Sequence, residues 1–516
     1  MNQRLRYPAL YQINTPVYLA TLSKNRRCPA TLDDIPDSDL DALAARGFDW
    51  VWFLGVWQTG AKGREVSRSV PEWRREFQAL LSDLSEEDIT GSFFSVVDYS
   101  VHSNFGGDPA LARLRKRLKG RGLKLLLDFI PNHTARDHRW VQERPDFYVS
   151  GNEADLAREP GNYTRVGGSG DRADRMMAYG RDPYFPGWPD TFQLNYGHPP
   201  LQEAMTGELL KIAERCDGVR CDMAMLLLPE VFERTWGIKA APFWPMATRA
   251  VRERSPEFLF MAEVYWDLEW TLQHQGFDYC YDKRLYDRLR EGEARPVREH
   301  LRAGLDFQDR LARFLENHDE PRAAAVFPPE MHRAAAVITF FSPGLRFFHQ
   351  GEPEGHQRRI PVHLRRGPEE PIDGEISQFY NHLLACLREE PFRQGEWRLL
   401  EAVAAWEGNG TFDHFIAYGW SGPNGALRLA AVNFGPTRGQ CYVRLPFPEL
   451  AGRDWRLQDR MGPAVYDRNG DDLLSRGLYL DMPAWGDHIF SFVQMRTDES
   501  SRTLLSAGIP SNEEES

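Results

Sequence analysis

The sequence predicts an α/β protein whose largest domain is a (β/α)8 barrel of the TIM type, with an inserted subdomain after the third strand and a C-terminal all-β sandwich domain. Three observations lead to this prediction. Apolar segments alternate with helical patterns, giving eight strand candidates; several of these segments are apolar throughout; and the pattern changes to short β-rich runs near Trp397. Strands that are buried on both faces are typical of a parallel sheet covered by helices.

Length, charge and cysteine content set further limits. A chain of 516 residues with 42% hydrophobic and 27% charged residues is typical of a globular protein with one large and one smaller domain. The formal net charge of −12 argues against nucleic acid or an anionic membrane as a partner, because both bind basic surfaces. The six cysteines lack metal-site spacing, so we expect reduced thiols without a disulfide or zinc.

The N-terminal residues contain no pattern typical of targeting. Residues 1–22 include charged side chains and two prolines that interrupt every apolar stretch. We therefore expect neither a signal peptide nor a membrane span, and a cytoplasmic protein. The sequence leaves the oligomeric state open.

The barrel elements are predicted in chain order from apolar segments and helical spacing. Strands are expected at residues 10–19, 50–54, 123–129, 218–222, 260–263, 277–281, 311–316 and 345–349. Helices are expected at residues 40–46, 107–120, 201–213 and 243–253. The helix that begins at Gly107 has Leu111, Leu114 and Leu118 on one face, which is the spacing of a buried stripe.

Two segments depart from this alternation. Residues 134–195 have no periodicity and are rich in Gly, Asp, Arg and aromatic residues, so we expect a subdomain at the active rim. From 397 onward, turn signals such as Asn424-Gly425 and Asn469-Gly470 separate short β-rich runs. The predicted domains are the barrel at 1–133 and 196–396, the subdomain at 134–195, the β domain at 397–497 and a disordered tail at 498–516.

Three short stretches that each end in a carboxylate indicate where the chemistry lies. They are GVRCD at 218–222, FMAE at 260–263 and FLENHD at 314–319. If each stretch leaves a parallel strand, the carboxylates meet at one rim of the barrel. Arg220 and Asp222 are two residues apart, so they point to the same side of a strand, and the guanidinium can keep Asp222 ionised.

A fourth stretch, DFIPNH at 128–133, leaves the third predicted strand. The four stretches in this order resemble the signature of glycoside hydrolase family 13, the α-amylase family. A fifth, Gln193-Leu194-Asn195, is similar to the short family motif at the end of the subdomain. The resemblance extends from the first strand to Trp485-Gly486-Asp487 and implies an enzyme that binds a carbohydrate substrate.

The resemblance also implies catalytic roles. In a retaining mechanism on an α-glycoside, Asp222 attacks the anomeric carbon, and Glu263 first protonates the leaving oxygen and then deprotonates the acceptor. Asp319 is the third acid, which binds sugar hydroxyls and stabilises the charged transition state. Such a mechanism needs one ionised and one protonated carboxyl group on opposite faces of the bond.

Substrate-binding positions follow from the same resemblance. They are Arg220, His133, His318, Phe94, Asp98 and Asp128. Asp128 is expected to orient Arg220. The two histidines are expected to hydrogen-bond the sugar ring, with a core position as the alternative for each. Four further aromatic residues could equally stack on sugar faces or belong to the core, namely Trp57, Trp188, Tyr265 and Trp266.

The sequence departs from the family pattern at two positions. Phe94 stands where a tyrosine usually stacks on the cleaved sugar, which is similar to the sucrose-phosphorylase branch. The apolar residues 223–227 replace the Lys-His pair that many amylases use for an acceptor sugar and for calcium. We therefore predict no cofactor and no metal, although Asn132 is present. Subdomain carboxylates could still form a calcium site built differently, namely Asp155, Asp171, Asp174 and Asp182.

Three functions remain open from the sequence. The first is a hydrolase acting on α-1,4-glucans or malto-oligosaccharides. The second is a transglucosylase or phosphorylase that passes the same glucosyl-enzyme to a sugar or phosphate. The third is a binding protein on an inactive hydrolase fold, which the presence of Asp222, Glu263, Asp319 and Arg220 disfavours.

Overall fold

A computed structural model describes residues 5–167 and 174–495. The chain forms two compact units, of which the first ends at Glu389 and the second begins at Glu390. The predicted tail at 498–516 and the calcium candidate Asp171 lie outside the described residues.

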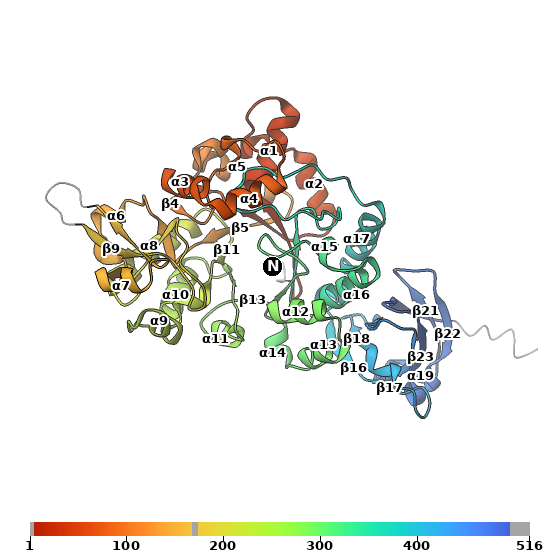
Figure 1. Cartoon of the computed structure of the whole chain (residues 1–516). Coiled ribbons are helices and arrows are strands. Elements are labelled where there is room, and N and C mark those ends of the chain that lie inside the picture. The colour runs from red at the N-terminus through yellow and green to blue at the C-terminus, as the bar shows by residue number, and fades with distance from the viewer. Residues whose placement is uncertain (1–4, 168–173, 496–516) are drawn as a thin grey trace, which may run out of the picture. The chain divides into compact units, whose positions relative to one another are not determined.

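Eight parallel strands close into a barrel in the first unit (Figure 1). They are β1 (Ala9–Asn14), β2 (Trp50–Leu54), β5 (Lys124–Phe129), β11 (Gly218–Cys221), β12 (Leu259–Ala262), β13 (Tyr279–Tyr281), β14 (Leu311–Arg313) and β15 (Leu345–His349). Neighbours in the barrel follow chain order, and β1 closes it by pairing with both β2 and β15. Because nearly every strand residue is buried, the strands read as continuous apolar segments, and the predicted fold class is confirmed.

Helices surround the barrel strands in the first unit (Figure 1). They are α1 (Thr15–Arg26), α2 (Asp37–Ala45), α3 (Ala61–Ser69), α4 (Pro71–Leu80), α5 (Gly107–Lys119), α8 (Pro199–Ala213), α9 (Pro229–Trp236), α10 (Trp244–Arg254), α11 (Glu269–His274), α12 (Lys283–Glu291), α13 (Ala294–His300), α14 (Leu305–Gln308), α15 (Ala323–Val326), α16 (Pro329–Phe340) and α17 (Gly374–Leu387). In α5, Leu111, Leu114 and Leu118 are buried as their spacing predicted.

The prediction of one strand over 10–19 was wrong in its second half. The strand β1 ends at Asn14, and the helix α1 begins at Thr15. Asn14 caps this helix, because its side chain accepts a hydrogen bond from the Val17 N–H at 3.4 Å, and Pro16 lies in the first turn. The next three residues, Val-Tyr-Leu, favour a strand by propensity. The cap and the proline nevertheless determine the helix.

The segment 134–195 forms two small antiparallel sheets. Its first strand begins one residue earlier, at His133. The elements are β6 (His133–Ala135), α6 (Trp140–Glu143), β7 (Ser150–Gly151), α7 (Glu153–Arg158), β8 (Tyr163–Val166), β9 (Arg175–Ala178) and β10 (Thr191–Gln193). The strand β6 pairs with β10, with His133 opposite Gln193, so the two ends of the segment are tied together directly after β5. A further antiparallel pair, β3 (Trp57–Thr59) and β4 (Val96–Val101), lies between β2 and α5 in the chain.

The second unit consists of a six-stranded and a three-stranded antiparallel sheet over one apolar core. Its elements are α18 (Glu390–Gln394), β16 (Glu396–Leu400), β17 (Ala402–Val403), β18 (Phe415–Ser421), β19 (Leu427–Asn433), β20 (Gly439–Val443), β21 (Asp454–Asp459), β22 (Val465–Asn469), α19 (Gly470–Arg476), β23 (Leu478–Met482) and β24 (Asp487–Gln494). The unit starts with α18, ahead of the predicted boundary at 397. Asn424-Gly425 turns between β18 and β19, whereas Asn469 caps α19 instead of forming a hairpin turn.

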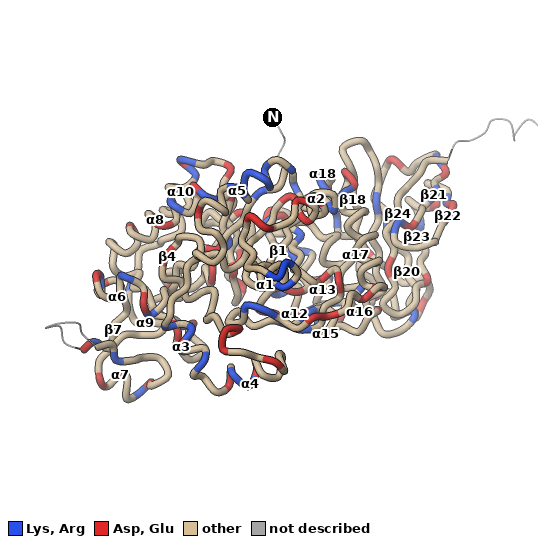
Figure 2. The backbone as a smooth tube through the Cα atoms, turned by 90° about the horizontal axis from the view of Figure 1, so that it is seen from above, with Lys and Arg blue, Asp and Glu red and all other residues tan. Residues whose placement is uncertain are grey.

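Charged positions of both signs are interspersed along the backbone (Figure 2). All six cysteines are free thiols, and five of them are buried. Over residues 5–167 and 174–495, no helix has the length and apolar character needed to cross a membrane.

Candidate active site

The predicted carboxylates come together at the carboxyl ends of the barrel strands. Asp222 directly follows β11, Glu263 directly follows β12, and Asp319 lies on the loop after β14. All three line one cavity of about 320 Å³, together with Phe94 and His133. The rest of the lining comprises Trp73, Ser92, Trp188, Asp190, Thr191, Met223, Tyr265, Val362 and His363. Loops at the carboxyl ends of the strands are where barrel enzymes place their active sites.

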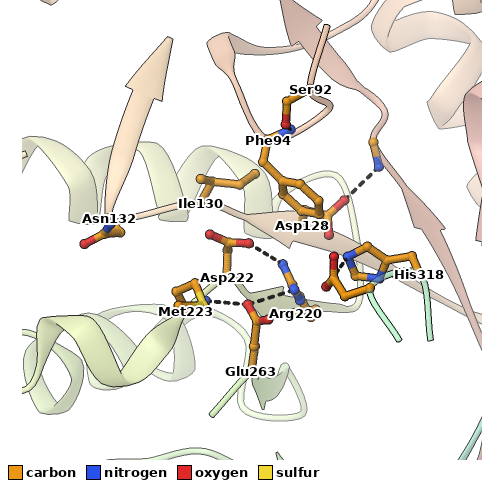
Figure 3. A network of polar contacts seen from close by, with 12 residues as sticks. Ser92, Phe94, Asp128, Ile130, Asn132, Arg220, Asp222, Met223, Glu263 and His318 are labelled. Atoms are coloured by element: carbon orange, nitrogen blue, oxygen red, sulfur yellow. Dashed lines mark hydrogen bonds and ion pairs between the residues drawn. The ribbon is translucent and has the colours of Figure 1, made fainter. Parts of the chain in front are cut away.

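The guanidinium of Arg220 lies between two of the carboxylates (Figure 3). Its Nη1 donates to Asp222 Oδ1 at 2.7 Å, and its Nη2 contacts Glu263 Oε2 at 2.8 Å. The arginine is fully buried on β11, two residues before Asp222. The spacing predicted the contact with Asp222, whereas nothing in the sequence indicated the second contact with Glu263.

The two carboxyl groups share this one positive charge, so their proton affinities are linked. Burial raises the pKa of Glu263 to about 7, and the charge of Asp222 adds to this effect against the opposing charge of Arg220. Burial also raises the pKa of Asp222, which Arg220 lowers both by its charge and by its hydrogen bond. Glu263 is thus the group suited to hold a proton near neutral pH, while Arg220 favours the ionised form of Asp222.

Glu263 is held by two further donors. The Met223 N–H donates to Oε2 at 2.7 Å, and the Tyr265 hydroxyl donates to Oε1 at 2.8 Å. Met223 has left-handed backbone angles, with φ of 43° and ψ of 45°, which are uncommon for a residue with a side chain. Met223 directly follows Asp222, and in this conformation its own N–H points at Glu263. Backbone strain of this kind occurs where surrounding structure enforces it, as in active sites.

Asp319 contacts its neighbour His318. The Nε2 atom of His318 lies 2.9 Å from Asp319 Oδ2, and the Nδ1 atom lies 2.9 Å from the amide nitrogen of Gln12. The Asp319 side chain is 42% exposed because it faces the cavity, and protein surrounds it on its other sides. Desolvation there acts to raise the pKa of Asp319, but His318 lowers it to about 2. Asp319 is therefore ionised at neutral pH.

Phe94 and His133 also line the cavity. The Phe94 ring is half-buried, with its centroid 5.2 Å from the Arg220 guanidinium carbon and 5.4 Å from the His318 ring. His133 packs against Trp188, with ring centroids 5.2 Å apart. Burial lowers the pKa of His133 to about 4, so the imidazole is neutral and can hydrogen-bond a sugar hydroxyl.

Four predicted substrate-binding residues do not line the cavity, namely Arg220, His318, Asp98 and Asp128. His318 is buried with its two ring nitrogens at Gln12 and Asp319, so it supports Asp319 rather than reaching a sugar in the cavity. Asp98 lies on β4, where Val96 and Val101 are buried and the Asp98 side chain points to solvent; it accepts a hydrogen bond from the Ser100 N–H at 2.7 Å. Asp128 is buried beneath the site, where it accepts from Trp52 Nε1 at 3.1 Å and from the Gly55 N–H at 2.8 Å.

The expected role of Asp128 in orienting Arg220 therefore needs correction. Both of its carboxylate oxygens accept hydrogen bonds from β2 and the residue after it, so Asp128 acts on Arg220 by its charge rather than by a direct hydrogen bond. Burial raises the pKa of Asp128 to about 6, and the charge of Arg220 opposes this rise.

Of the four aromatic residues considered for sugar stacking, two line the cavity and two do not. Trp188 and Tyr265 line the cavity, as expected for substrate contacts. Trp57 is buried and donates to the Asp128 carbonyl at 2.7 Å, so it belongs to the core. Trp266 does not line this cavity but an adjoining one. Trp73 and His363 also line the cavity, although they lie outside the sequence motifs and no pattern in the sequence relates one to the other.

Several residues considered as cation ligands already accept hydrogen bonds within the protein. The Asn132 oxygen accepts from Gln193 Nε2 at 3.0 Å, and the Asn132 amide nitrogen donates back to Gln193 Oε1 at 3.2 Å. Asp155 and Asp182 accept hydrogen bonds from backbone N–H groups. Within the described ranges, no group of three or more His, Cys, Asp or Glu side chains has an arrangement that could hold a metal ion.

Comparisons with known proteins agree with this geometry. Residues 94–370, more than half of the chain, match the family model "Alpha amylase, catalytic domain". The chain is 25% identical to "Alpha-amylase MalA" of Haloarcula japonica over 365 residues, which cover 69% of this chain and 49% of that protein. It is 26% identical to "Trehalose synthase/amylase TreS" of Mycolicibacterium smegmatis over 259 residues, which cover 43% and 41%. The chain thus spans about half the length of these curated relatives or less.

Among solved structures, a maltogenic alpha-amylase AmyB from Thermotoga neapolitana superposes with a TM-score of 0.67 at 18% identity, and the match covers 96% of this chain and 100% of that one. This likeness shows that the two share a fold. Together with the family model that matches more than half of the sequence, it leads to one conclusion: the chain belongs to the alpha-amylase family.

Proposed function

We propose that the protein is a retaining α-glycoside hydrolase that acts on α-1,4-glucans or malto-oligosaccharides. The observation that carries this proposal is the contact of one buried guanidinium, that of Arg220, with both Asp222 and Glu263. Retaining glycosidases hold their two carboxyl groups about 5–5.5 Å apart, closer than inverting enzymes do. A single guanidinium that contacts both groups keeps them near each other.

In the first step, Asp222 attacks the anomeric carbon of the bound glucosyl residue. Oδ1 of Asp222 is engaged by Arg220, whereas Oδ2 accepts no hydrogen bond from the described residues and is free to form the new bond. The bond from the anomeric carbon to the leaving oxygen breaks, and Glu263 gives its proton to that oxygen. The raised pKa of Glu263, about 7, keeps this proton available near neutral pH.

In the second step, the ionised Glu263 takes a proton from water, and the water oxygen replaces Asp222 at the anomeric carbon. The sugar is released with its original configuration, and Glu263 is protonated again. Asp319, His133 and Phe94 face the same cavity and are placed to bind the ring, with the ionised Asp319 opposite the developing positive charge.

Transfer of the glucosyl group to a sugar or phosphate is the second candidate function. Two observations favour it. Phe94 stands at the sugar-stacking position where the sequence is similar to the sucrose-phosphorylase branch, and one curated relative carries the name trehalose synthase/amylase. The first step is the same in both functions. They differ only in whether water or another acceptor reaches the glucosyl-enzyme.

Product analysis distinguishes the two functions. The protein is incubated with maltose, maltoheptaose, sucrose, trehalose or glycogen, with and without inorganic phosphate. We expect new reducing sugar from maltoheptaose that does not depend on phosphate. Longer oligosaccharides or trehalose would instead establish transfer to a sugar, and a glucose phosphate would establish phosphorolysis. The Asp222→Asn variant serves as the control for contaminating activity.

Calcium is not expected to contribute to stability. The oxygen of Asn132 is occupied by the Gln193 amide, and residues 224–227 after Asp222 are buried apolar side chains rather than ligands. We expect the thermal midpoint and the activity to be unchanged by a calcium chelator. A midpoint that falls by several degrees with chelator and recovers with added calcium would show that a bound ion stabilises the fold, and it would contradict this prediction.

A further inference from the structure

A stacked aromatic pair lines one side of the cavity. Trp73 of α4 and His363 of the loop after β15 have ring centroids 4.4 Å apart and planes inclined by 29°. The Ser67 hydroxyl lies 3.0 Å from His363 Nδ1 and holds the imidazole in place. Both rings line the cavity with Val362 beside them. We refer to Trp73, Val362 and His363 as the aromatic wall.

The aromatic wall is fastened by backbone hydrogen bonds. The Thr90 N–H donates to the His363 carbonyl at 2.9 Å, and the Phe93 N–H donates to the Val362 carbonyl at 3.2 Å. The side chains next to these bonds form a small buried apolar cluster of their own, made of Phe77, Leu81, Ile89 and Leu364. The wall therefore rests on packed structure, since it has both paired backbone and a core beneath it.

Ion pairs join the loop after β15 to α4 and to the segment that follows α4. Arg359 of the loop contacts Glu76 of α4 at 2.7 Å. Arg366 contacts Asp88 at 2.8 Å, and the Asp88 side chain is only 3% exposed. An exposed pair such as the first contributes little, but a buried carboxylate that loses its partner is strongly disfavoured. Asp88 and Arg366 thus hold the loop against the segment that precedes Phe94.

With Glu263 on the leaving-group side, the aromatic wall is assigned to the sugar-ring side of the scissile bond. One of the backbone hydrogen bonds that hold the wall comes from Phe93, the residue directly before Phe94. The wall and Asp319 line the same cavity. Glu263 marks the opposite side, because the acid must reach the leaving oxygen. There Met223 and Tyr265, which both bind Glu263, also line a second cavity of about 380 Å³. The space on the leaving-group side therefore continues into the second cavity, whereas Trp73, Val362 and His363 bound the first cavity on the ring side.

We propose that the aromatic wall limits the ring side of the site to a single terminal glucosyl residue, so that the enzyme acts on chain ends rather than on internal bonds. This inference rests on the proposed function. A second residue on the ring side would have to occupy the space that Trp73 and His363 fill. The leaving group is under no such limit, because the cavity shared by Met223 and Tyr265 extends past Trp266.

Two glycosyl fluorides test this proposal independently of the acceptor. α-Glucosyl fluoride places one residue on the ring side and α-maltosyl fluoride places two, while the leaving group is the same small ion. We expect kcat/KM for fluoride release to be at least 100-fold higher with glucosyl fluoride. Comparable values, or a preference for maltosyl fluoride, would overturn the proposal and leave the proposed glucosyl-enzyme intact. No fluoride release from either donor would overturn both.

Variants of the aromatic wall provide the second part of the test. In Trp73→Ala and His363→Ala, the ratio of kcat/KM for glucosyl fluoride to kcat/KM for maltosyl fluoride is expected to fall at least 10-fold. Each change removes a ring from the space that a second sugar residue would need. Trp73→Phe should keep most of the preference, and Trp406→Ala, a change of an exposed tryptophan in the second unit, should keep all of it. If correctly folded Ala variants, judged by circular dichroism, retained the full preference, the wall would not be its cause.

Discussion

Replacing Asp222 with Asn is expected to lower kcat on maltoheptaose at least about 1,000-fold, a barrier increase of roughly 4 kcal/mol, without unfolding the protein. The amide oxygen is too weak a nucleophile to form the glycosyl-enzyme. The side-chain volume is unchanged, and the amide oxygen can still accept from Arg220 Nη1, which now contacts Asp222 at 2.7 Å. Loss of activity with an unchanged fold would isolate the chemical step.

The measurements are initial rates, far-ultraviolet circular dichroism and the thermal midpoint. A matched control is Asp98→Asn, which makes the same chemical change at an exposed carboxylate on β4, outside the cavity. Its activity should stay within about twofold of wild type. If Asp222→Asn kept more than about a tenth of the turnover, a difference below roughly 1.4 kcal/mol, Asp222 could not be the nucleophile.

Replacing Glu263 with Gln is expected to have an effect that depends on the leaving group. A sugar leaving group needs a proton, and general acids typically contribute about 10²–10⁴-fold, so turnover of maltoheptaose should fall by that factor. Fluoride needs no proton, so the first step with α-glucosyl fluoride should remain comparatively fast. The second step lacks its base and becomes slow. We therefore expect a burst of one fluoride per active site followed by slow turnover.

The pH profile provides an independent measure of the same role. Because the pKa of Glu263 is raised to about 7, the proton it donates is present below that pH and lost above it. For wild type, kcat/KM on maltoheptaose should fall as the pH rises through about 7, and Glu263→Gln should lack this limb. Equal losses on maltoheptaose and on the fluoride, with no burst, would contradict the assignment of Glu263 as the acid.

Much of the barrel could be predicted from the sequence because its signals are local. A buried strand is a short apolar run, and a carboxylate at its end marks the rim, so the positions of Asp222 and Glu263 were predicted from the residues around them, whereas their roles came from the family resemblance. The error over residues 10–19 was also local, since the helix cap at Asn14 has a weaker signal than three strand-forming residues. Asp98 was misplaced because a motif match does not show which residues of β4 are exposed, and the pairing of β4 with β3 is irregular.

The remaining features of the site depend on contacts between distant segments. Gln12 of β1 contacts His318 on the loop after β14, and Trp73 stacks on His363, although both pairs lie far apart in the chain. The left-handed conformation of Met223 depends on the packing around Glu263, and its residue type does not indicate it. Such contacts leave no periodicity or spacing in the sequence, so a single chain without its structure does not reveal them.

The closure of the barrel has a consequence for how the protein is made on the ribosome. One edge of β1 can pair with β2 early, but its other edge pairs only with β15, which lies roughly 330 residues further along the chain. At about 5–20 residues per second, that edge waits roughly 20–70 s for its partner. During this interval an apolar strand with unpaired N–H and C=O groups is open to pairing with other chains. The nascent chain is therefore most exposed to aggregation until Leu345–His349 has left the ribosome, and a chaperone that covers β1 over this interval would increase the yield of folded protein.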